Sequence, residues 1–215
     1  MIQSNLNCKT IFKEAFNNRY TWPRNFNGYG GKCLFTNNEK SICGEFILGK
    51  NFQPQIKNII DDDIVKSISS QLFEVCIHRV KRQFDDIHMK NNFKFLKESE
   101  NGIEMQVAGK NEGDKYTVKD KKINMVYRHM HGVIIEIFVE EFLDTGHGYL
   151  SKKYTSQHLD PENLSPKSLC LEYLDNFINL RNSDLWVLES RVIKNIRQDQ
   201  NEILYKYSFQ DLFQI

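Results

Sequence analysis

Long apolar runs are missing from this 215-residue sequence. No window approaches the 18 consecutive apolar residues that a membrane-spanning helix needs, so no transmembrane segment is expected. The N-terminal stretch MIQSNLNC has no basic region followed by an apolar run, so we expect no secretory signal. Together these absences predict a cytoplasmic protein. The formal net charge is only +1, which gives no electrostatic reason to expect nucleic-acid binding.

Paired cysteines are also missing. The chain has five cysteines, an odd number, and no two of them have the C-x-x-C spacing of metal-binding or redox motifs. A disulfide framework and a structural zinc site are therefore both disfavoured. We expect reduced, mostly buried thiols.

Common catalytic motifs are absent as well. The sequence contains no G-x-S-x-G elbow, no P-loop and no G-x-G-x-x-G fingerprint. A turn explains Gly146-His147-Gly148, and Gly28, Gly30 and Gly31 are interpreted as loop glycines that need positive φ. No cofactor is expected. Whether the protein is an enzyme stays open, and these absences favour a protein that is not.

Aromatic residues are plentiful, with 15 Phe, 9 Tyr and 2 Trp, and such residues favour strands. Helical apolar spacing occurs in two places. Residues 7–18 predict a short amphipathic helix capped by Ser4 or Asn7. Residues 62–84 predict a long helix whose apolar stripe includes Leu72 and Val80.

Period-two patterns fill most of the remaining chain, and turn-forming residues separate them. The expected strands cover residues 33–36, 43–48, 53–59, 93–96, 103–107, 116–118, 123–130, 133–142, 149–158, 169–178, 185–196 and 203–213. A polar, proline-marked loop is expected at 158–166. This order predicts a single α+β domain over residues 1–215. Its fold would be a long, curved, half-barrel-like antiparallel meander with one short N-terminal helix and one long helix packed on it.

Four groups of motifs, in order, resemble those of a known family. They are Asn18-Arg19-Tyr20-Thr21-Trp22 with Phe26-Asn27-Gly28-Tyr29, Ile77-His78-Arg79-Val80-Lys81-Arg82 with Phe84, Arg128-His129-Met130-His131-Gly132-Val133, and Asp144-Thr145-Gly146-His147-Gly148-Tyr149-Leu150-Ser151. The pattern is similar to the domain-of-unknown-function 3386 family of cyanobacteria and plastids. The likeness spans roughly residues 10–195.

That resemblance implies a protein of the cyanobacterial cytosol or plastid stroma, and it implies no established activity. The sequence departs from the family pattern at its cysteine-containing hairpin, Cys33 and Cys43, and at a shortened loop around 160–168. The order of helices and strands is also similar to the periplasmic lipoprotein carriers of the LolA type, without a shared sequence motif. This second likeness concerns architecture and only suggests binding of an apolar ligand.

Six residues are candidates for ligand binding: Tyr20, Trp22, His78, Arg79, Arg82 and Arg128. Tyr20 and Trp22 sit in an Arg-aromatic cluster, which marks either a binding surface or a packed joint between elements. Arg79 and Arg82 are three residues apart and could hold an anionic group, although charge complementation at a helix end explains them too.

Two histidines give the only metal hypothesis. His129 and His131 would share one face of a strand, and His78, His88 or His147 could complete a site. Gly132 indicates a hairpin tip at residue 131. A tip there would break the strand geometry that puts both histidines on one face, and they would then be histidines of a turn or a strand edge.

Two function classes follow from these features. The favoured one is a non-catalytic binding or accessory protein of a photosynthetic cell, which holds a hydrophobic molecule or docks a protein partner on a curved sheet. We expect a sheltered apolar cavity between this sheet and the long helix, because both alternating residue sets of strands 133–142 and 184–195 contain apolar side chains. The alternative is an enzyme or metal-binding protein that uses His129, His131 and His78.

Overall fold

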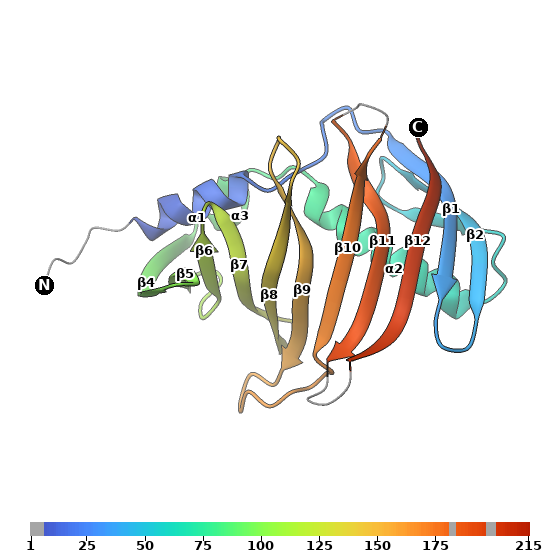
Figure 1. Cartoon of the computed structure of the whole chain (residues 1–215). Coiled ribbons are helices and arrows are strands. Elements are labelled where there is room, and N and C mark those ends of the chain that lie inside the picture. Colours follow the sequence, from blue (N-terminus) through green and yellow to red (C-terminus); the bar gives the residue numbers. More distant parts are fainter. Residues whose placement is uncertain (1–6, 181–183, 197–200) are drawn as a thin grey trace, which may run out of the picture. The chain divides into compact units, whose positions relative to one another are not determined.

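The computed structural model describes residues 7–180, 184–196 and 201–215. The chain divides into two compact units (Figure 1). The first consists of Met1–Tyr20 and Arg82–Leu171, and the second of Thr21–Lys81 and Glu172–Ile215. The described residues form three helices and twelve strands, and the ladders between neighbouring strands are antiparallel, so the predicted α+β class is confirmed. The single domain over 1–215 stays a prediction.

The first unit is a six-stranded antiparallel meander with two helices. Its strands follow one another in the order β4 (Asn91–Ser99), β5 (Gly102–Gly109), β6 (Lys115–Lys119), β7 (Lys122–Met130), β8 (Val133–Asp144) and β9 (Tyr149–Leu159). Its helices are α1 (Cys8–Asn17) and α3 (Phe84–His88). The Asn7 side chain caps α1 by accepting a hydrogen bond from Thr10 N at 3.1 Å, as expected for one of the two proposed caps. Ser4 lies outside the described residues.

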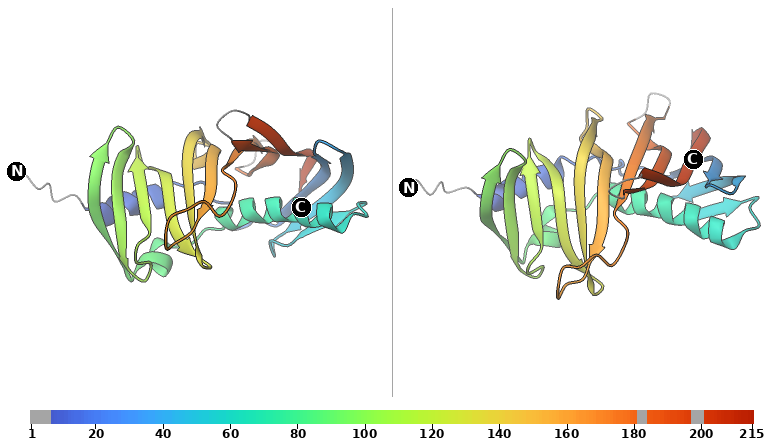
Figure 2. Two further views of the ribbon diagram at one scale, coloured as in Figure 1. Left: turned by 90° about the horizontal axis from the view of Figure 1, so that it is seen from below. Right: turned by 60° about the horizontal axis from the view of Figure 1, so that its bottom comes forward.

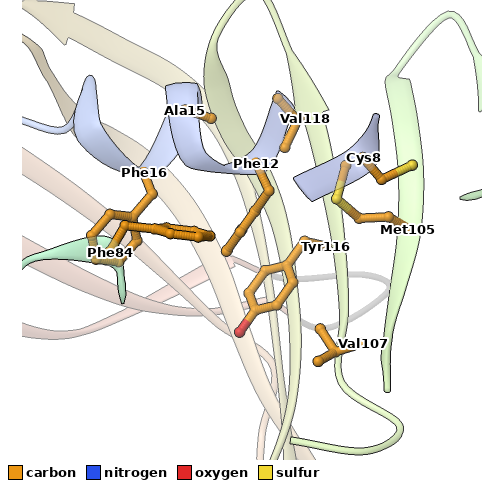
Figure 3. Close-up of a cluster of buried hydrophobic side chains, with 9 residues drawn as sticks. All are labelled: Cys8, Phe12, Ala15, Phe16, Phe84, Met105, Val107, Tyr116 and Val118. Carbon is orange, nitrogen blue, oxygen red and sulfur yellow. The ribbon is translucent and has the colours of Figure 1, made fainter. Parts of the chain in front are cut away.

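Aromatic rings make up the core of the first unit. Phe12 of α1 lies among the rings of Phe84 and Tyr116 (Figure 3). The centroid of its ring is 4.4 Å from that of Tyr116, 6.1 Å from that of Phe84 and 4.8 Å from that of Phe93. Met105 and other apolar side chains of β5 and β6 complete this cluster. The apolar face of α1 predicted from spacing is therefore the face that packs on the sheet.

Two of the family-like motifs meet in the first unit. The chain around residue 19 forms a bridge to the start of β9, in which Tyr20 N donates to Tyr149 O and Tyr149 N donates to Asn18 O, each at 2.9 Å. Gly148 has φ +132°, and a Cβ atom there would lie 2.6 Å from Asn18 O. Only glycine allows this close approach of the two segments.

The second unit combines a sheet with the longest helix. Its strand order is β3 (Pro54–Lys57), β2 (Ser41–Gly49), β1 (Gly28–Thr36), β12 (Asn201–Gln214), β11 (Trp186–Ile196) and β10 (Leu171–Asn179). Helix α2 (Asp62–Arg79) runs along one face of these strands (Figure 2). The Asp61 side chain caps it by accepting from Asp63 N and Ile64 N. No helix in the described part of the chain is long and apolar enough to span a membrane.

The long helix is shorter than predicted. It ends at Arg79, and Val80 is extended, with φ −69° and ψ 123°. Phe84 begins the separate helix α3 and is buried beside Phe12 of the first unit. The apolar spacing did continue to Phe84, but packing of that ring in a different core determined where the helix ends.

The glycine-rich stretch after residue 25 is also not the turn that was predicted. Strand β1 already begins at Gly28, and of its three glycines only Gly28 has a positive φ. At Gly31 an added Cβ would lie 2.5 Å from the backbone oxygen of Gln210. Glycine is needed there because β12 approaches closely.

Leu72→Ala should lower the free energy of unfolding by about 2–5 kcal/mol, the usual cost of emptying a buried leucine position. Leu72 is fully buried on the sheet-facing side of α2. Both tryptophans, Trp22 and Trp186, belong to the second unit, so urea unfolding followed by tryptophan fluorescence reports on it. A loss below about 1 kcal/mol would contradict the packing of α2 described above.

All five cysteines are free thiols in the structure. Only Cys43 is exposed, whereas Cys8, Cys33 and Cys76 are buried, and burial raises the pKa of Cys33 to about 11 and that of Cys76 to about 12. Titration of unfolded, non-reduced protein should find five reactive thiols. In the folded protein Cys43 should react first, because its thiol is exposed. The thiolate is the reactive form of cysteine, and burial both shields Cys33 and Cys76 and disfavours their thiolates. Rapid reaction of Cys76 instead would contradict its burial.

A candidate ligand-binding hollow on the second unit

Strands β11 and β12 are paired along only part of their length. The ladder between them runs from Ile196↔Asn201 to Ser190↔Ser208. Beyond Ser208, β12 continues as the partner of β1 to Gln214, with no described ladder to β11. The part of β12 after Ser208 therefore has a paired edge toward β1 and an open edge toward β11.

A β-bulge accompanies this separation. Between the pairs Gly30↔Phe213 and Lys32↔Gln210, two residues of β12 stand opposite the single residue Gly31. One of them, Asp211, has φ 49°, a left-handed conformation that is uncommon outside glycine. Lys32 Nζ holds its carboxylate at 2.7 Å. Bulges bend the strand that carries them, which fits the divergence of β12 from β11.

The diverging strands leave a hollow of about 550 Å³, which we call the β10–β12 hollow. Its volume is within the range of pockets that hold small molecules. Its lining comes from three strand ends: Ile178, Asn179, Leu180, Glu189, Ser190, Ser208, Phe209, Gln210, Asp211 and Leu212. Apolar and polar side chains share this lining, and Ile178 is 39% exposed.

The hollow opens on the sheet face away from α2. Arg191 of β11 and Tyr207 of β12 contact α2 through Gln71 at 2.9 Å and Ser67 at 2.7 Å. Since neighbouring residues of a strand point to opposite faces, Ser190 and Ser208 point away from the helix. The hollow thus lies on the face opposite the one where the sequence placed its cavity.

The helix side of this sheet is filled by a polar network. The Arg191 guanidinium donates two hydrogen bonds of 2.7 Å to the Asp175 carboxylate and one of 2.9 Å to Gln71, and lies 3.3 Å from Glu74. Arg191 and Asp175 are only 2% and 3% exposed. Together with the apolar residues of α2, they occupy the space where the sequence predicted an apolar cavity. Burial, with Glu74 as a second cause, raises the pKa of the adjacent Tyr173 to about 12.

The aromatic candidates Tyr20 and Trp22 are both buried. Tyr20 belongs to the first unit, next to β9, while Trp22 belongs to the second. The Trp22 indole stacks on Phe26 at 4.1 Å and donates to Trp186 O at 2.9 Å. Arg19 lies over the Phe16 ring at 3.8 Å. These contacts are those of packed joints.

The three basic candidates near the end of α2 fall in different places. His78 is exposed, and Arg79 lies 5.5 Å from the Phe177 ring, both in the second unit. Arg82 is exposed and belongs to the first unit. Arg79 and Arg82 are thus not on one helix face, because α2 ends between them.

Arg128 and the two histidines lie at one end of β7. Arg128 Nε is 3.5 Å from Asp114 Oδ2, while His129 N donates to Asp114 Oδ1 at 2.9 Å. His131 is exposed on the β7–β8 turn, with φ 52°. It is therefore outside the strand geometry that would place both imidazoles on one face. No group of three potential metal-ligating side chains was found within residues 7–180, 184–196 and 201–215.

His88 is a buried titratable group that the sequence did not single out as a core residue. It is 6% exposed and surrounded by the rings of Phe12, Phe16 and Phe84 at 5.1–5.5 Å. Its Nδ1 lies 3.1 Å from Asn91 Nδ2. Burial, reinforced by the nearby cations Arg128, Arg19 and Lys9, lowers the pKa of His88 to about 4.

The sequence reasoning named none of the residues that line the hollow as binding residues. Asp175 and Arg191, which form the buried ion pair but do not line the hollow, carried a usable signal, because each places a charge two positions from an apolar residue of the same strand face, Tyr173 for Asp175 and Ile193 for Arg191. No comparable signal marked Ile178, Glu189 or Asp211. Their grouping depends on where the β11–β12 ladder stops.

Comparison with known proteins gave one family match. The model of a family described as a protein of unknown function (DUF3386) matches residues 3–215, which confirms the family expected from the motifs. Curated proteins gave no match. A solved structure described as an outer membrane lipoprotein-sorting protein domain from Vibrio parahaemolyticus has a TM-score of 0.33 and 8% identity, over 95% of this chain and 91% of that one. That neighbour is of the carrier type named above, but so distant a similarity supports no functional assignment. The chain belongs to the DUF3386 family.

Proposed function

We propose that this protein is a non-catalytic binding protein and that it holds a small hydrophobic molecule with a polar end in the β10–β12 hollow. The observation that carries the proposal is the end of the β11–β12 ladder at Ser208, which leaves a hollow of about 550 Å³ lined by three strands. A strand end that loses its neighbour exposes apolar side chains and backbone polar groups together. An amphipathic ligand can cover both.

The lining matches such a ligand. Ile178 and Leu212 offer apolar surface, and covering it contributes roughly 25 cal/mol per Å². Asn179 and Gln210 offer amide groups that can orient a polar end. The described residues that line the hollow include no nucleophile–base pair, which favours binding without reaction.

The cellular role in this proposal follows from the family resemblance. A DUF3386 protein of the cyanobacterial cytosol or plastid stroma would act as an accessory protein in a photosynthetic cell. Lipids, isoprenoids and tetrapyrroles are the hydrophobic molecules that we propose as ligands.

Filling the hollow should weaken ligand binding without unfolding the protein. Ser190→Phe places a ring in the hollow from the face opposite α2, and we expect it to weaken binding of dodecanol, measured by calorimetry, about tenfold or more. Ser41→Phe is the matched control, because Ser41 is exposed on β2, outside the hollow. Equal binding by wild type and Ser190→Phe, or no binding of dodecanol by the wild type, would refute the proposal.

A further inference from the structure

The wall that β12 gives to the β10–β12 hollow includes neighbouring residues from opposite faces of the strand. Ser208 and Gln210 point away from α2. Phe209, between them, shares the helix-side face with Tyr207 and is only 1% exposed, yet it also lines the hollow. A wall made by one strand face would contribute alternate residues only. The edge of β12, with its backbone N–H and C=O groups, therefore lines the hollow.

Strand β11 lines the hollow in the same way. Its lining residues are the neighbours Ser190 and Glu189, and Glu189 shares the helix-side face with Arg191, two residues away. The ladder between the strands ends at the pair Ser190↔Ser208. Within residues 7–180, 184–196 and 201–215, no ladder joins residues 187–189 of β11 to β12, or the part of β12 after Ser208 to β11. Two open strand edges thus border the hollow.

From this arrangement we infer that the hollow selects amphiphiles whose polar end is a secondary amide over matched ligands whose polar end cannot donate a hydrogen bond. This inference rests on the proposed function and adds the chemical class of the polar end. The N–H and C=O of a trans amide point in opposite directions. Such a group can therefore donate to one open edge and accept from the other, as a peptide group of an intervening strand does.

A tertiary amide in the same place would bind less well. It fills the same space and still accepts a hydrogen bond, but it has no N–H to donate. A backbone C=O of one edge is then covered by the ligand and left without a donor, which costs binding free energy.

The test uses two isomeric amides with the same tail. N-Ethyldodecanamide is a secondary amide and N,N-dimethyldodecanamide is a tertiary amide, and the two contain the same atoms. Each is titrated by calorimetry into the full chain, below its solubility limit and beside dodecanol. We expect the N-ethyl isomer to bind roughly three- to tenfold more tightly than the dimethyl isomer, the range of one net backbone hydrogen bond.

A double variant separates the strand edges from the side-chain amides Asn179 and Gln210, which also line the hollow. In Asn179→Ala/Gln210→Ala the ratio between the two isomers should persist, whatever happens to the affinity for each, because the backbone edges are unchanged. A ratio that falls to one in this variant would overturn the inference. Equal or tighter binding of the dimethyl isomer by the wild type would overturn it too, and dodecanol binding would then leave the proposed function standing. Failure of dodecanol and both amides to bind would instead refute the proposed function.

Discussion

Replacing Arg191 by leucine should lower the free energy of unfolding of the second unit by about 3–5 kcal/mol. Arg191 is almost completely buried and forms a two-pronged ion pair with Asp175, each hydrogen bond being 2.7 Å long. The substitution leaves the Asp175 carboxylate buried without its partner, and that desolvated charge is the main cost. Urea unfolding followed by the fluorescence of Trp22 and Trp186 measures the change.

Two variants separate this cause from a general loss of packing. In the double variant Arg191→Leu/Asp175→Leu no charge stays unpaired, so much of the lost stability should return. Lys194→Leu removes the cation of a partly exposed pair with Glu172, 3.3 Å apart, and should cost no more than about 1 kcal/mol. A double variant as unstable as Arg191→Leu would contradict the assignment of the cost to the unpaired carboxylate.

Acidification should destabilise the protein through His88. The pKa of His88 is about 4 in the folded protein and about 6.5 when unfolded, so between these values the unfolded chain binds more protons. Stability is then lost as pH falls below 6.5, by about 2 kcal/mol between pH 7.5 and pH 5 from this residue alone. Urea unfolding at the two pH values, followed by circular dichroism, gives the loss.

His88→Phe should remove this part of the pH dependence, whatever it does to the stability at pH 7.5. In the variant the Asn91 side chain keeps its hydrogen bond to Asn111 Oδ1 at 3.0 Å, but its second N–H loses the His88 acceptor, a cost that lowers the stability equally at both pH values. His158→Phe is the control, since His158 is exposed on β9 and should leave the pH dependence unchanged. Equal losses between pH 7.5 and pH 5 in the wild type and in His88→Phe would contradict the burial of a neutral His88.

The strands were predictable because their signal is local. For example, alternation along residues 149–158 and 203–213 predicted β9 and β12 to within a few residues. The end of α2 was not predictable, since the stripe from Leu72 to Phe84 obeys helical spacing and Phe84 joins a core made by residues of the first unit. Long-range packing decided that boundary.

The candidate site was less predictable than the fold for a related reason. Asp211 has no sequence signature of a bulge, and its left-handed backbone becomes apparent only beside Gly31 and Lys32, about 180 residues earlier in the chain. Candidates chosen by residue type, such as Trp22 and Tyr20, are packed in the interior instead. Arginines and aromatic residues serve cores as well as binding surfaces, so their presence in a sequence does not distinguish the two.

Photoaffinity labelling tests the location of the ligand site most directly. A dodecanol analogue with a diazirine in its tail is irradiated with the full chain, and mass spectrometry identifies the labelled peptides. We predict label on residues 178–180, 188–190 and 208–213, competed by unmodified dodecanol and lost in Ser190→Phe. Competed labelling confined to other peptides, or labelling that unmodified dodecanol does not reduce, would contradict the assignment of the β10–β12 hollow as the binding site.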